Sequence, residues 1–313
     1  MTSSLHAQNV VALVWDFDKT LIPGYMQDPI FAAYGVDAKT FWNEVNALPA
    51  HFARAGVRVH PDTTYLNHLI TYAHHGRFPG LNNARLRELG RAIAFHAGLP
   101  EFFDTVRTSL ADLPVEIRVE HYIVSTGLRA MIEGCAIRPF VDGIWASEFI
   151  ESAPLPGFGP SDAPAVGGTI SQIAVAYDNT SKTRALFEIN KGSNRDDAID
   201  VNATMRAEDR RVPFEHMIYI ADGPSDVPAF SLLGKNGGST LAVYDEQSDR
   251  SFAQAERLRH EGRVEYFGPA NYAPTSPTAR WLILRVRQIA QRILDARDAA
   301  VRDRVGAAPK HLG

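Results

Sequence analysis

A short segment near the start of the chain constrains the fold most. Residues 10–15 form a run of six apolar residues, VVALVW. The run is long enough for a strand and too short for a typical helix, and its valines favour a strand buried on both faces of a parallel sheet. Asp16 and Asp18 follow it directly. In open α/β sheets ligands bind at the carboxyl ends of the strands, where we expect these two acids.

Two more apolar runs, 121–124 and 217–221, have the same form. A single acidic pair after a strand is also typical of a solvated turn. Three strands that all end in small polar or acidic residues favour a shared site instead. The residues concerned are Asp16, Asp18, Ser125, Thr126, Gly127, Asp222 and Asp226.

With these motifs the sequence resembles the haloacid dehalogenase-like (HAD) hydrolase superfamily, and within it the phosphoserine-phosphatase-like branch. The matching features are DxDxT from Asp16 to Thr20, a serine after a strand at Ser125, a lysine at Lys182, and the acidic pair after the third strand. The resemblance covers about 10–30 and 98–245. It departs from the family pattern at Ala221, where many relatives have glycine.

The pattern and the resemblance together predict an α/β fold: a doubly wound parallel sheet, Rossmann-like, with an inserted all-α cap domain. Between 28 and 97 apolar residues recur at three- and four-residue spacing, which indicates helices. We therefore expect the core at 1–27 and 98–277, the cap at 28–97, and one C-terminal helix at 278–313. The family's cap closes over the site, excludes water and selects the substrate.

Composition excludes several classes of protein. The chain has 313 residues, 45% of them hydrophobic, as in an ordinary globular protein with a core. A net charge of -4 argues against a nucleic-acid partner. A single cysteine, Cys135, and the lack of a long apolar run predict a cytoplasmic protein without membrane contact. The sequence leaves the oligomeric state open.

The acidic residues predict a metal site. If Asp16, Asp18 and Asp222 converge, each pair repels by roughly 4 kcal/mol at about 4 Å, on the order of 12 kcal/mol for three pairs. A hard dication with oxygen ligands would offset this repulsion, and Mg²⁺ is the usual choice beside phosphate. The resemblance implies Mg²⁺ on Asp16, on the backbone carbonyl of Asp18 and on Asp222, with Asp226 as an outer ligand.

The resemblance also implies roles in the hydrolysis of a small-molecule phosphate monoester. Asp16 would attack phosphorus and form an aspartyl phosphate, and Asp18 would act as general acid and base. Lys182 would neutralise Asp16 and the transferred group, although Lys191 is a rival that more simply caps its helix. The expected phosphate-binding residues are Ser125, Thr126, Gly127 and Thr20, with Ser125 as a helix cap the alternative.

Several alternatives stay open at this point. A phosphotransferase or phosphomutase would use the same nucleophile, and a non-catalytic binding protein on the same fold would need none of the acids. Tyr25 and Met26, in the family's mobile flap, are expected to contact either the substrate or the cap. The substrate itself cannot be named from the residues.

Overall fold

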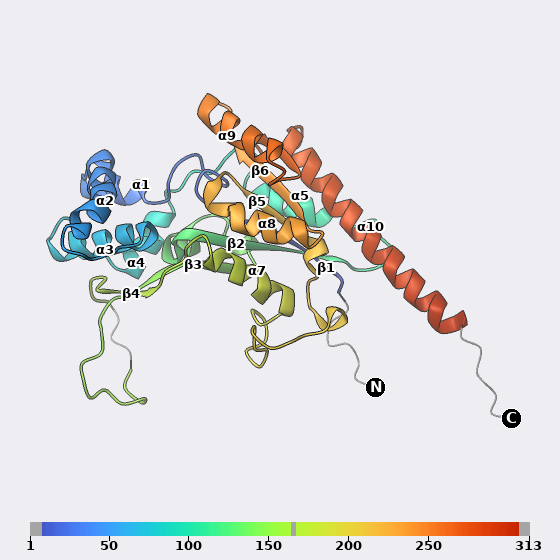
Figure 1. The fold of residues 1–313 in the computed structure, drawn as a ribbon, viewed down its shortest axis with the longest axis horizontal. Helices are drawn as coiled ribbons and strands as arrows, with labels where there is room; N and C mark the ends of the chain where they lie inside the picture. Colours follow the sequence, from blue (N-terminus) through green and yellow to red (C-terminus); the bar gives the residue numbers. More distant parts are fainter. Residues whose placement is uncertain (1–7, 164–166, 307–313) are drawn as a thin grey trace.

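The computed structural model describes residues 8–163 and 167–306 and contains a seven-stranded sheet in the order β4-β3-β2-β1-β5-β6-β7 (Figure 1). Six neighbouring strands run parallel to one another: β3, β2, β1, β5, β6 and β7. The edge strand β4 pairs antiparallel with β3. The predicted α/β class is confirmed. The strands are β1 Val10–Trp15, β2 Arg118–Leu128, β3 Gly143–Ile150, β4 Gln172–Val175, β5 Met217–Ala221, β6 Ser239–Tyr244 and β7 Tyr266–Pro269.

Helices cover both faces of the sheet because alternate side chains of each strand point to opposite faces. On one face Val11, Leu13 and Trp15 belong to a core shared with α5, α6 and α10, and on the other Val10 and Val14 pack with α7, α8 and α9. The sheet is therefore doubly wound, as predicted. The helices are α1 Asp28–Tyr34, α2 Ala38–Ala53, α3 Pro61–His74, α4 Asn83–Gly90, α5 Glu101–Thr108, α6 Arg129–Gly134, α7 Ser181–Lys191, α8 Val227–Lys235, α9 Asp249–His260 and α10 Pro277–Gly306.

Helices α1 to α4 follow β1 and gather beside the β3 and β4 end of the sheet (Figure 1). No strand lies among residues 28–97, all of which the structure describes. Helix α4 packs closely on α6, since a Cβ atom at Gly90 would lie 2.2 Å from the carbonyl oxygen of Met131. We therefore propose 28–97 as the cap, attached to the core through α4.

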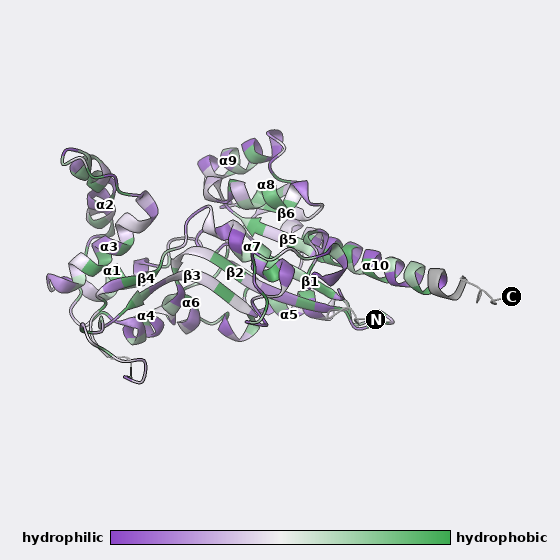
Figure 2. Cartoon of the chain, turned by 60° about the horizontal axis from the view of Figure 1, so that its bottom comes forward, coloured by the Kyte–Doolittle hydropathy of each residue, from purple (hydrophilic) through white to green (hydrophobic). Residues whose placement is uncertain are grey.

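The C-terminal helix α10 packs on the core of its own chain. Its buried residues, including Leu282, Val286 and Ile289, join the core of one sheet face. Residues 295–302 are exposed, and the helix extends beyond the sheet, with hydrophilic and hydrophobic residues alternating along it (Figure 2). No helix in the described part of the chain is both long and apolar enough to cross a bilayer.

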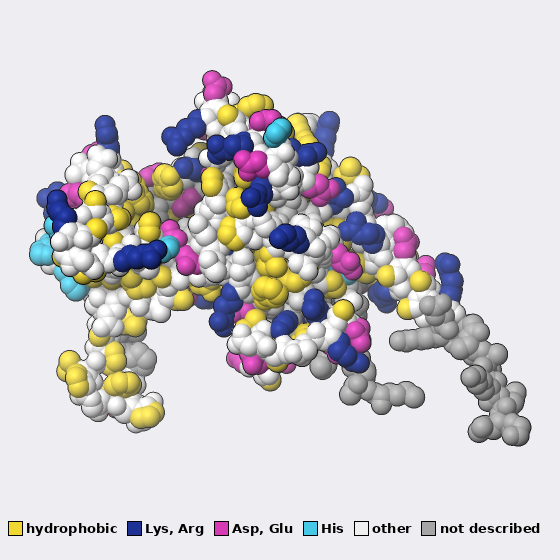
Figure 3. Space-filling model, in the orientation of Figure 1, with side chains coloured by type: hydrophobic (Ala, Val, Ile, Leu, Met, Phe, Trp, Pro, Cys, Tyr) yellow, Lys and Arg dark blue, Asp and Glu magenta, His cyan; other side chains and the backbone are white. Residues whose placement is uncertain are grey.

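Residues 152–169 are rich in Pro, Gly, Ser and Ala, which predicts an exposed loop after β3, followed by a strand at 169–176 that pairs with β3 in a hairpin. Within 152–169, the described residues 152–163 and 167–169 form no helix or strand, and Leu155 and Phe158 are 81% and 62% exposed. Figure 3 shows hydrophobic side chains on a segment that projects away from the body of the molecule. The segment then returns to form β4, so the predicted hairpin with β3 is confirmed.

The residue types predict a core helix at 127–135, Ser181 as the N-cap of the next helix, and a helix at 227–233 closed by Gly234. Several of these boundaries were wrong. Strand β2 continues to Leu128, and α6 begins at Arg129, not at Gly127. Thr180, and not Ser181, is the N-cap of α7, where the Asp178 carboxylate accepts hydrogen bonds from the backbone N–H groups of both.

Further differences lie in the second half of the core. Lys191 does not cap α7: its ammonium donates to the carbonyls of Val201 and Ala203 at 2.6 and 2.5 Å. Helix α8 continues past Gly234 to Lys235. Helix α9 and strand β7 were not predicted, because α9 is too polar and β7 too short to give a clear periodic signal.

The buried His121 predicts how acid affects stability. Its Nδ1 accepts a hydrogen bond from Trp15 Nε1 at 3.2 Å, and its Nε2 lies 3.3 Å from the Phe103 carbonyl. Burial lowers the pKa of His121 to about 3. The unfolded chain therefore binds a proton below about pH 6.5 that the native protein does not, so stability rises with pH in this range.

We expect this group to contribute a loss of ~1.4 kcal/mol for each pH unit below about pH 6. His121→Asn should be less stable at pH 7 and should lose stability less steeply towards pH 4. Urea unfolding at several pH values measures both slopes. His51→Asn, at an exposed position, is the control and should keep the wild-type slope. Parallel curves for wild type and His121→Asn would contradict the prediction.

Candidate active site

The two acidic motifs meet because their strands are neighbours. Strands β1 and β5 pair in parallel with Trp15 opposite Ile220. The Asp16 N–H continues this ladder by donating to the Ile220 carbonyl at 2.8 Å. Asp16 therefore leaves the sheet at the same edge as Asp222, which directly follows β5.

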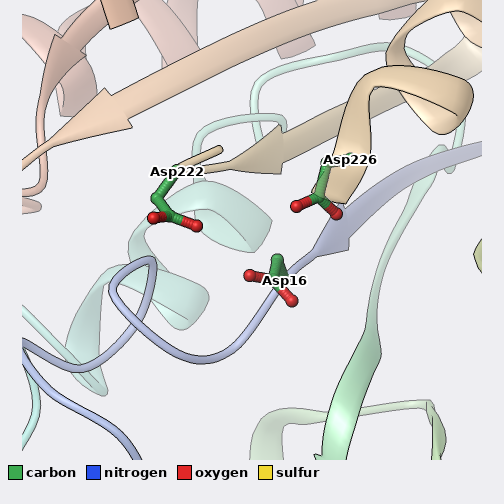
Figure 4. Close-up of side chains that lie close together, drawn as sticks. All are labelled: Asp16, Asp222 and Asp226. Atoms are coloured by element: carbon green, nitrogen blue, oxygen red, sulfur yellow. The ribbon is translucent and has the colours of Figure 1, made fainter. Parts of the chain in front are cut away.

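Three carboxylates form a cluster at this edge (Figure 4). Asp16, Asp222 and Asp226 each place one oxygen so that all three atoms lie within 4.8 Å of one another. Asp226 stands on the single turn Pro224–Asp226 that leads into α8. Acids more than 200 positions apart therefore lie together, but where the sequence predicts that Asp16, Asp18 and Asp222 converge, the third acid of the cluster is Asp226.

Lys182, in the first turn of α7, is the cation of this cluster. Its Nζ donates to Asp16 Oδ1 at 2.8 Å and to Asp226 Oδ1 at 2.6 Å, and the side chain is 1% exposed. Asp226 also accepts hydrogen bonds from Tyr219 and Ser225 at 2.6 and 2.8 Å. Because both Asp226 oxygens are engaged, Asp226 mainly positions Lys182, which leaves Asp16 and Asp222 as the better candidates for metal ligands.

The cluster carries more negative than positive charge. Burial raises the pKa of Asp16 to about 6, against the opposing effect of Lys182. Burial, followed by repulsion from Asp16, raises the pKa of Asp222 to about 7. Burial opposes the charge of Lys182, but Asp16 and Asp226 outweigh it and raise the pKa of the lysine. A buried, oxygen-rich cluster with a deficit of positive charge fits a hard divalent cation.

Asp18 lies beside the cluster and is held separately. Its Oδ1 accepts a hydrogen bond from the Met26 N–H at 2.8 Å. Burial, followed by the charge of Asp16, raises the pKa of Asp18 to about 8. The Asp18 carboxylate is not part of the three-acid cluster, so its side chain is available as a proton donor.

These residues line a cavity of about 250 Å³. Its walls come from the segment after β1, the end of β2, the first turn of α7, the segment after β5, and α9. The lining residues are Asp16, Asp18, Lys19, Tyr25, Thr126, Lys182, Asp222, Gly223, Pro224, Ser225 and Gln254.

Of the four residues predicted to bind phosphate, one lines the cavity and three do not. Thr126 lines the cavity, but Ser125, Gly127 and Thr20 do not. The Ser125 side chain is buried, and its Oγ accepts a hydrogen bond from the Gly127 N–H at 3.0 Å. Thr20 is fully buried, and its carbonyl accepts a hydrogen bond from Tyr272 at 2.7 Å. The expected helix N-terminus at 126–127 is absent because this segment still belongs to β2.

The sequence did not reveal every cavity residue. Gln254 donates to the Asp222 carbonyl at 3.0 Å, but it lies on the unpredicted helix α9. Tyr65, on α3, does not line the cavity but donates to the carbonyl of the cavity residue Thr126 at 2.5 Å, a contact without a sequence signal. Of the two flap residues, Tyr25 lines the cavity and Met26 is fully buried.

The histidines of the helical insertion have local partners. His68 Nε2 lies 2.7 Å from a carboxylate oxygen of Glu44, and His74 Nε2 lies 3.1 Å from the Ile170 carbonyl. The acidic cluster described above is the one group in the described residues that could hold a metal ion.

Comparison with known proteins gives one relative in sequence and several in structure. No family model matches the chain. An uncharacterised protein of Borreliella burgdorferi is 37% identical over 287 residues, which cover 89% of this chain and 97% of that protein.

Two of the similar solved structures share little sequence with the chain. A HAD family hydrolase from Salmonella enterica serovar Typhi has a TM-score of 0.49 at 14% identity, over 83% of this chain and 66% of that one. The chain thus spans just under two thirds of that hydrolase. A probable phosphoserine phosphatase from Vibrio cholerae has a TM-score of 0.49 at 13% identity, over 92% of this chain and 68% of that one.

The doubly wound sheet, the helical insertion after β1 and the motifs at the ends of β1 and β5 are what the sequence resemblance implied. The extent of the match to the Borreliella burgdorferi protein leads to a plain conclusion: this chain belongs to the same protein family as that uncharacterised protein.

Proposed function

We propose that this chain is a Mg²⁺-dependent phosphatase that hydrolyses a small-molecule phosphate monoester through an aspartyl-phosphate intermediate on Asp16. The observation that carries the proposal is the buried contact of Lys182 with Asp16 and Asp226, beside Asp222, at the carboxyl edge of the sheet. In this group one lysine lies between two carboxylates, and a third carboxylate lies at the cavity wall. Such a group suits a site that must hold both a dication and a phosphoryl group.

Asp16 and Asp222 would hold the metal, with the Asp18 backbone carbonyl as a third ligand and Asp226 in an outer position. When bound, Mg²⁺ would neutralise negative charge on the phosphoryl oxygens. The donor set supports this assignment because its carboxylate oxygens lie close together, Asp16 and Asp226 are buried, and the group is short of positive charge.

Asp16 acts as the nucleophile in the proposed reaction. Lys182 binds Oδ1 of Asp16, which fixes the carboxylate and favours its ionised form. A carboxylate oxygen of Asp16 forms a bond to phosphorus while the bond from phosphorus to the leaving oxygen breaks. Lys182 also stabilises the negative charge that develops on the transferred group.

Asp18 moves the protons. In its protonated form it gives its proton to the leaving oxygen, and the Met26 N–H holds its carboxyl group in place beside the cavity. A water molecule then attacks phosphorus and gives a proton to Asp18, and the bond from phosphorus to the Asp16 oxygen breaks. Inorganic phosphate leaves, and both acids return to their starting state.

The first test is phosphate release from p-nitrophenyl phosphate in Mg²⁺, without any added alcohol. We expect turnover that EDTA abolishes and Mg²⁺ restores. Asp16→Asn should lose at least about a thousandfold in kcat, because the nucleophile is removed. Release that requires an alcohol acceptor would identify a phosphotransferase, and a lack of any reaction would contradict catalysis.

Asp18→Asn tests the proton-transfer step. We expect kcat to fall by about 10²- to 10⁴-fold, since the amide cannot give or take the proton, while calorimetry still detects Mg²⁺ binding. The matched control is Asp245→Asn, because Asp245 follows β6 at the same sheet edge but does not line the cavity. Undiminished turnover in Asp18→Asn would remove Asp18 from the mechanism.

Lys182→Met tests the charge balance of the site independently of activity. Without metal, we expect the free energy of unfolding to fall by about 3–5 kcal/mol, because two buried carboxylates lose their cation. Adding Asp226→Asn to this variant should recover part of the loss. Lys191→Met is the control and should cost less, since Lys191 contacts neutral carbonyls. Urea unfolding measures all four proteins, and equal losses for the two lysine variants would contradict the assignment.

A further inference from the structure

We propose that a second cavity of this protein binds a small molecule with a chain of linked phosphate groups, as inorganic triphosphate and nucleoside triphosphates have. This second cavity has a volume of about 790 Å³ and shares no lining residue with the candidate active site. The inference does not depend on the proposed phosphatase function.

The second cavity lies at the amino ends of β6 and β7. Gly238 directly precedes β6, Val264 and Glu265 directly precede β7, and all three line the cavity. Helices α8 and α9 pack on β6, and α10 packs on β7. The acids of the active site stand instead at the carboxyl ends of β1 and β5, so the two sites lie at opposite edges of the sheet.

The second cavity is strongly basic. Five basic side chains line it against two acidic ones, Glu261 and Glu265, which gives a surplus of three positive charges. The whole chain has a net charge of -4, so the surplus is a local feature. Cations gathered in a concave site concentrate the positive potential there and attract anions. The basic residues are Lys235, Arg259, Arg263, Arg285 and Arg292.

Two of the five basic side chains have an acidic neighbour among the described residues. Arg285 forms an ion pair with Glu265, and its guanidinium lies 5.3 Å from the centroid of the Trp281 ring. Arg263 Nε lies 4.0 Å from a carboxylate oxygen of Glu261, which is too long for a hydrogen bond. Both arginines can still donate to a ligand, because a guanidinium carries five N–H groups.

The other three, Lys235, Arg259 and Arg292, have no carboxylate oxygen within 4.0 Å in the part of the chain that the structure describes. Arg292 donates to the neutral carbonyl of Glu215 at 3.2 Å. Lys235 and Arg259 lie in the last turns of α8 and α9, where a cation also stabilises the helix dipole. That role does not account for the two arginines in the interior of α10.

The arrangement of the cations indicates the class of ligand. They come from α8, from α9 and the turn after it, and from α10. On α10, Arg285 and Arg292 are seven residues apart, roughly 10 Å along the axis. A chain of phosphates offers a negative charge to each of several separated cations, which a single phosphate does not. Guanidinium groups suit phosphate oxygens because they donate two parallel hydrogen bonds.

The walls of the second cavity favour recognition of phosphate over recognition of a base. Among the described residues that line it, the apolar side chains are Phe230 and Val264, and both are buried, so neither offers a ring surface on which a base can stack. A Cβ atom at Gly234 or Gly262 would meet no atom within 4 Å, which leaves open space at the wall. The volume is within the range of small-molecule sites.

Calorimetry on metal-free protein tests the proposal with three ligands: inorganic triphosphate, ATP and inorganic phosphate. We expect one triphosphate per chain, bound at least about tenfold more tightly than inorganic phosphate, because it engages more cations. ATP should bind about as tightly as triphosphate, and added salt should weaken both. Without metal the acidic active site repels these anions and should not contribute.

Two double variants, matched in helix and in charge, locate the binding site. Arg259→Gln with Arg292→Gln removes one cavity cation from α9 and one from α10. Triphosphate binding should weaken by at least about tenfold, the lower end of the effect of losing a hydrogen bond to a charged group. Arg250→Gln with Arg297→Gln removes the same charge from the same two helices, at exposed positions outside the cavity, and the affinity should stay at the wild-type value.

Gly234→Glu places a negative charge in the cavity without a change in the fold. Gly234 lies within α8, and a Cβ atom there meets no atom within 4 Å, so the thermal midpoint should stay close to that of wild type. Triphosphate binding should be lost. Gly234→Gln, which has nearly the same size and no charge, is the control and should retain most of the binding.

Four outcomes would overturn the inference. The first is the absence of saturable triphosphate binding. The second is equal affinity for triphosphate and inorganic phosphate, since the site would then recognise a single anion. The third is an equal loss of affinity in the two double variants, since overall charge alone would then explain binding. The fourth is binding of ATP without binding of triphosphate, since the nucleoside would then be the group recognised.

Discussion

The buried bond of Lys182 with Asp16 and Asp226 is the interaction on which the site depends. It joins the end of β1, the first turn of α7 and the turn after β5, segments separated by 166 and 44 residues along the chain. A buried ammonium is costly unless it is paired, and a buried carboxylate equally so. Each of the three groups therefore makes the burial of the others possible. The carboxylates carry more negative charge than Lys182 can neutralise, and a dication would offset the remainder.

The rest of the fold holds these three segments in place. The sheet is covered on both faces, so β1 and β5 have little freedom to shift register, and their carboxyl ends stay level. The helical insertion then approaches from one side. Its Tyr65 bonds to the Thr126 carbonyl at 2.5 Å, and its Trp42 packs beside Tyr25, so it touches both sides of the cavity.

The charges at the cavity are balanced only when a dication is counted with them. Asp16, Asp222 and Asp226 carry three negative charges when ionised and Lys182 carries one positive charge, so a net charge of −2 remains for Mg²⁺ to offset. Lys19 also acts on this group, because it lowers the pKa of Asp222, and its Nζ donates to the Tyr25 hydroxyl at 2.6 Å.

The sequence by itself determined the sheet, the helical insertion and the acids at the ends of β1 and β5, because apolar runs and the residues after them are local signals. It also ranked Lys182 above Lys191, through the family resemblance. It failed where contacts decide local structure: β2 runs past Ser125, and so Ser125 and Gly127 stay behind the cavity wall. Only the tertiary structure placed β1 beside β5, engaged both oxygens of Asp226, and brought Gln254 to the site. The reason is physical: strand neighbours and side-chain partners are set by contacts between distant segments of the chain.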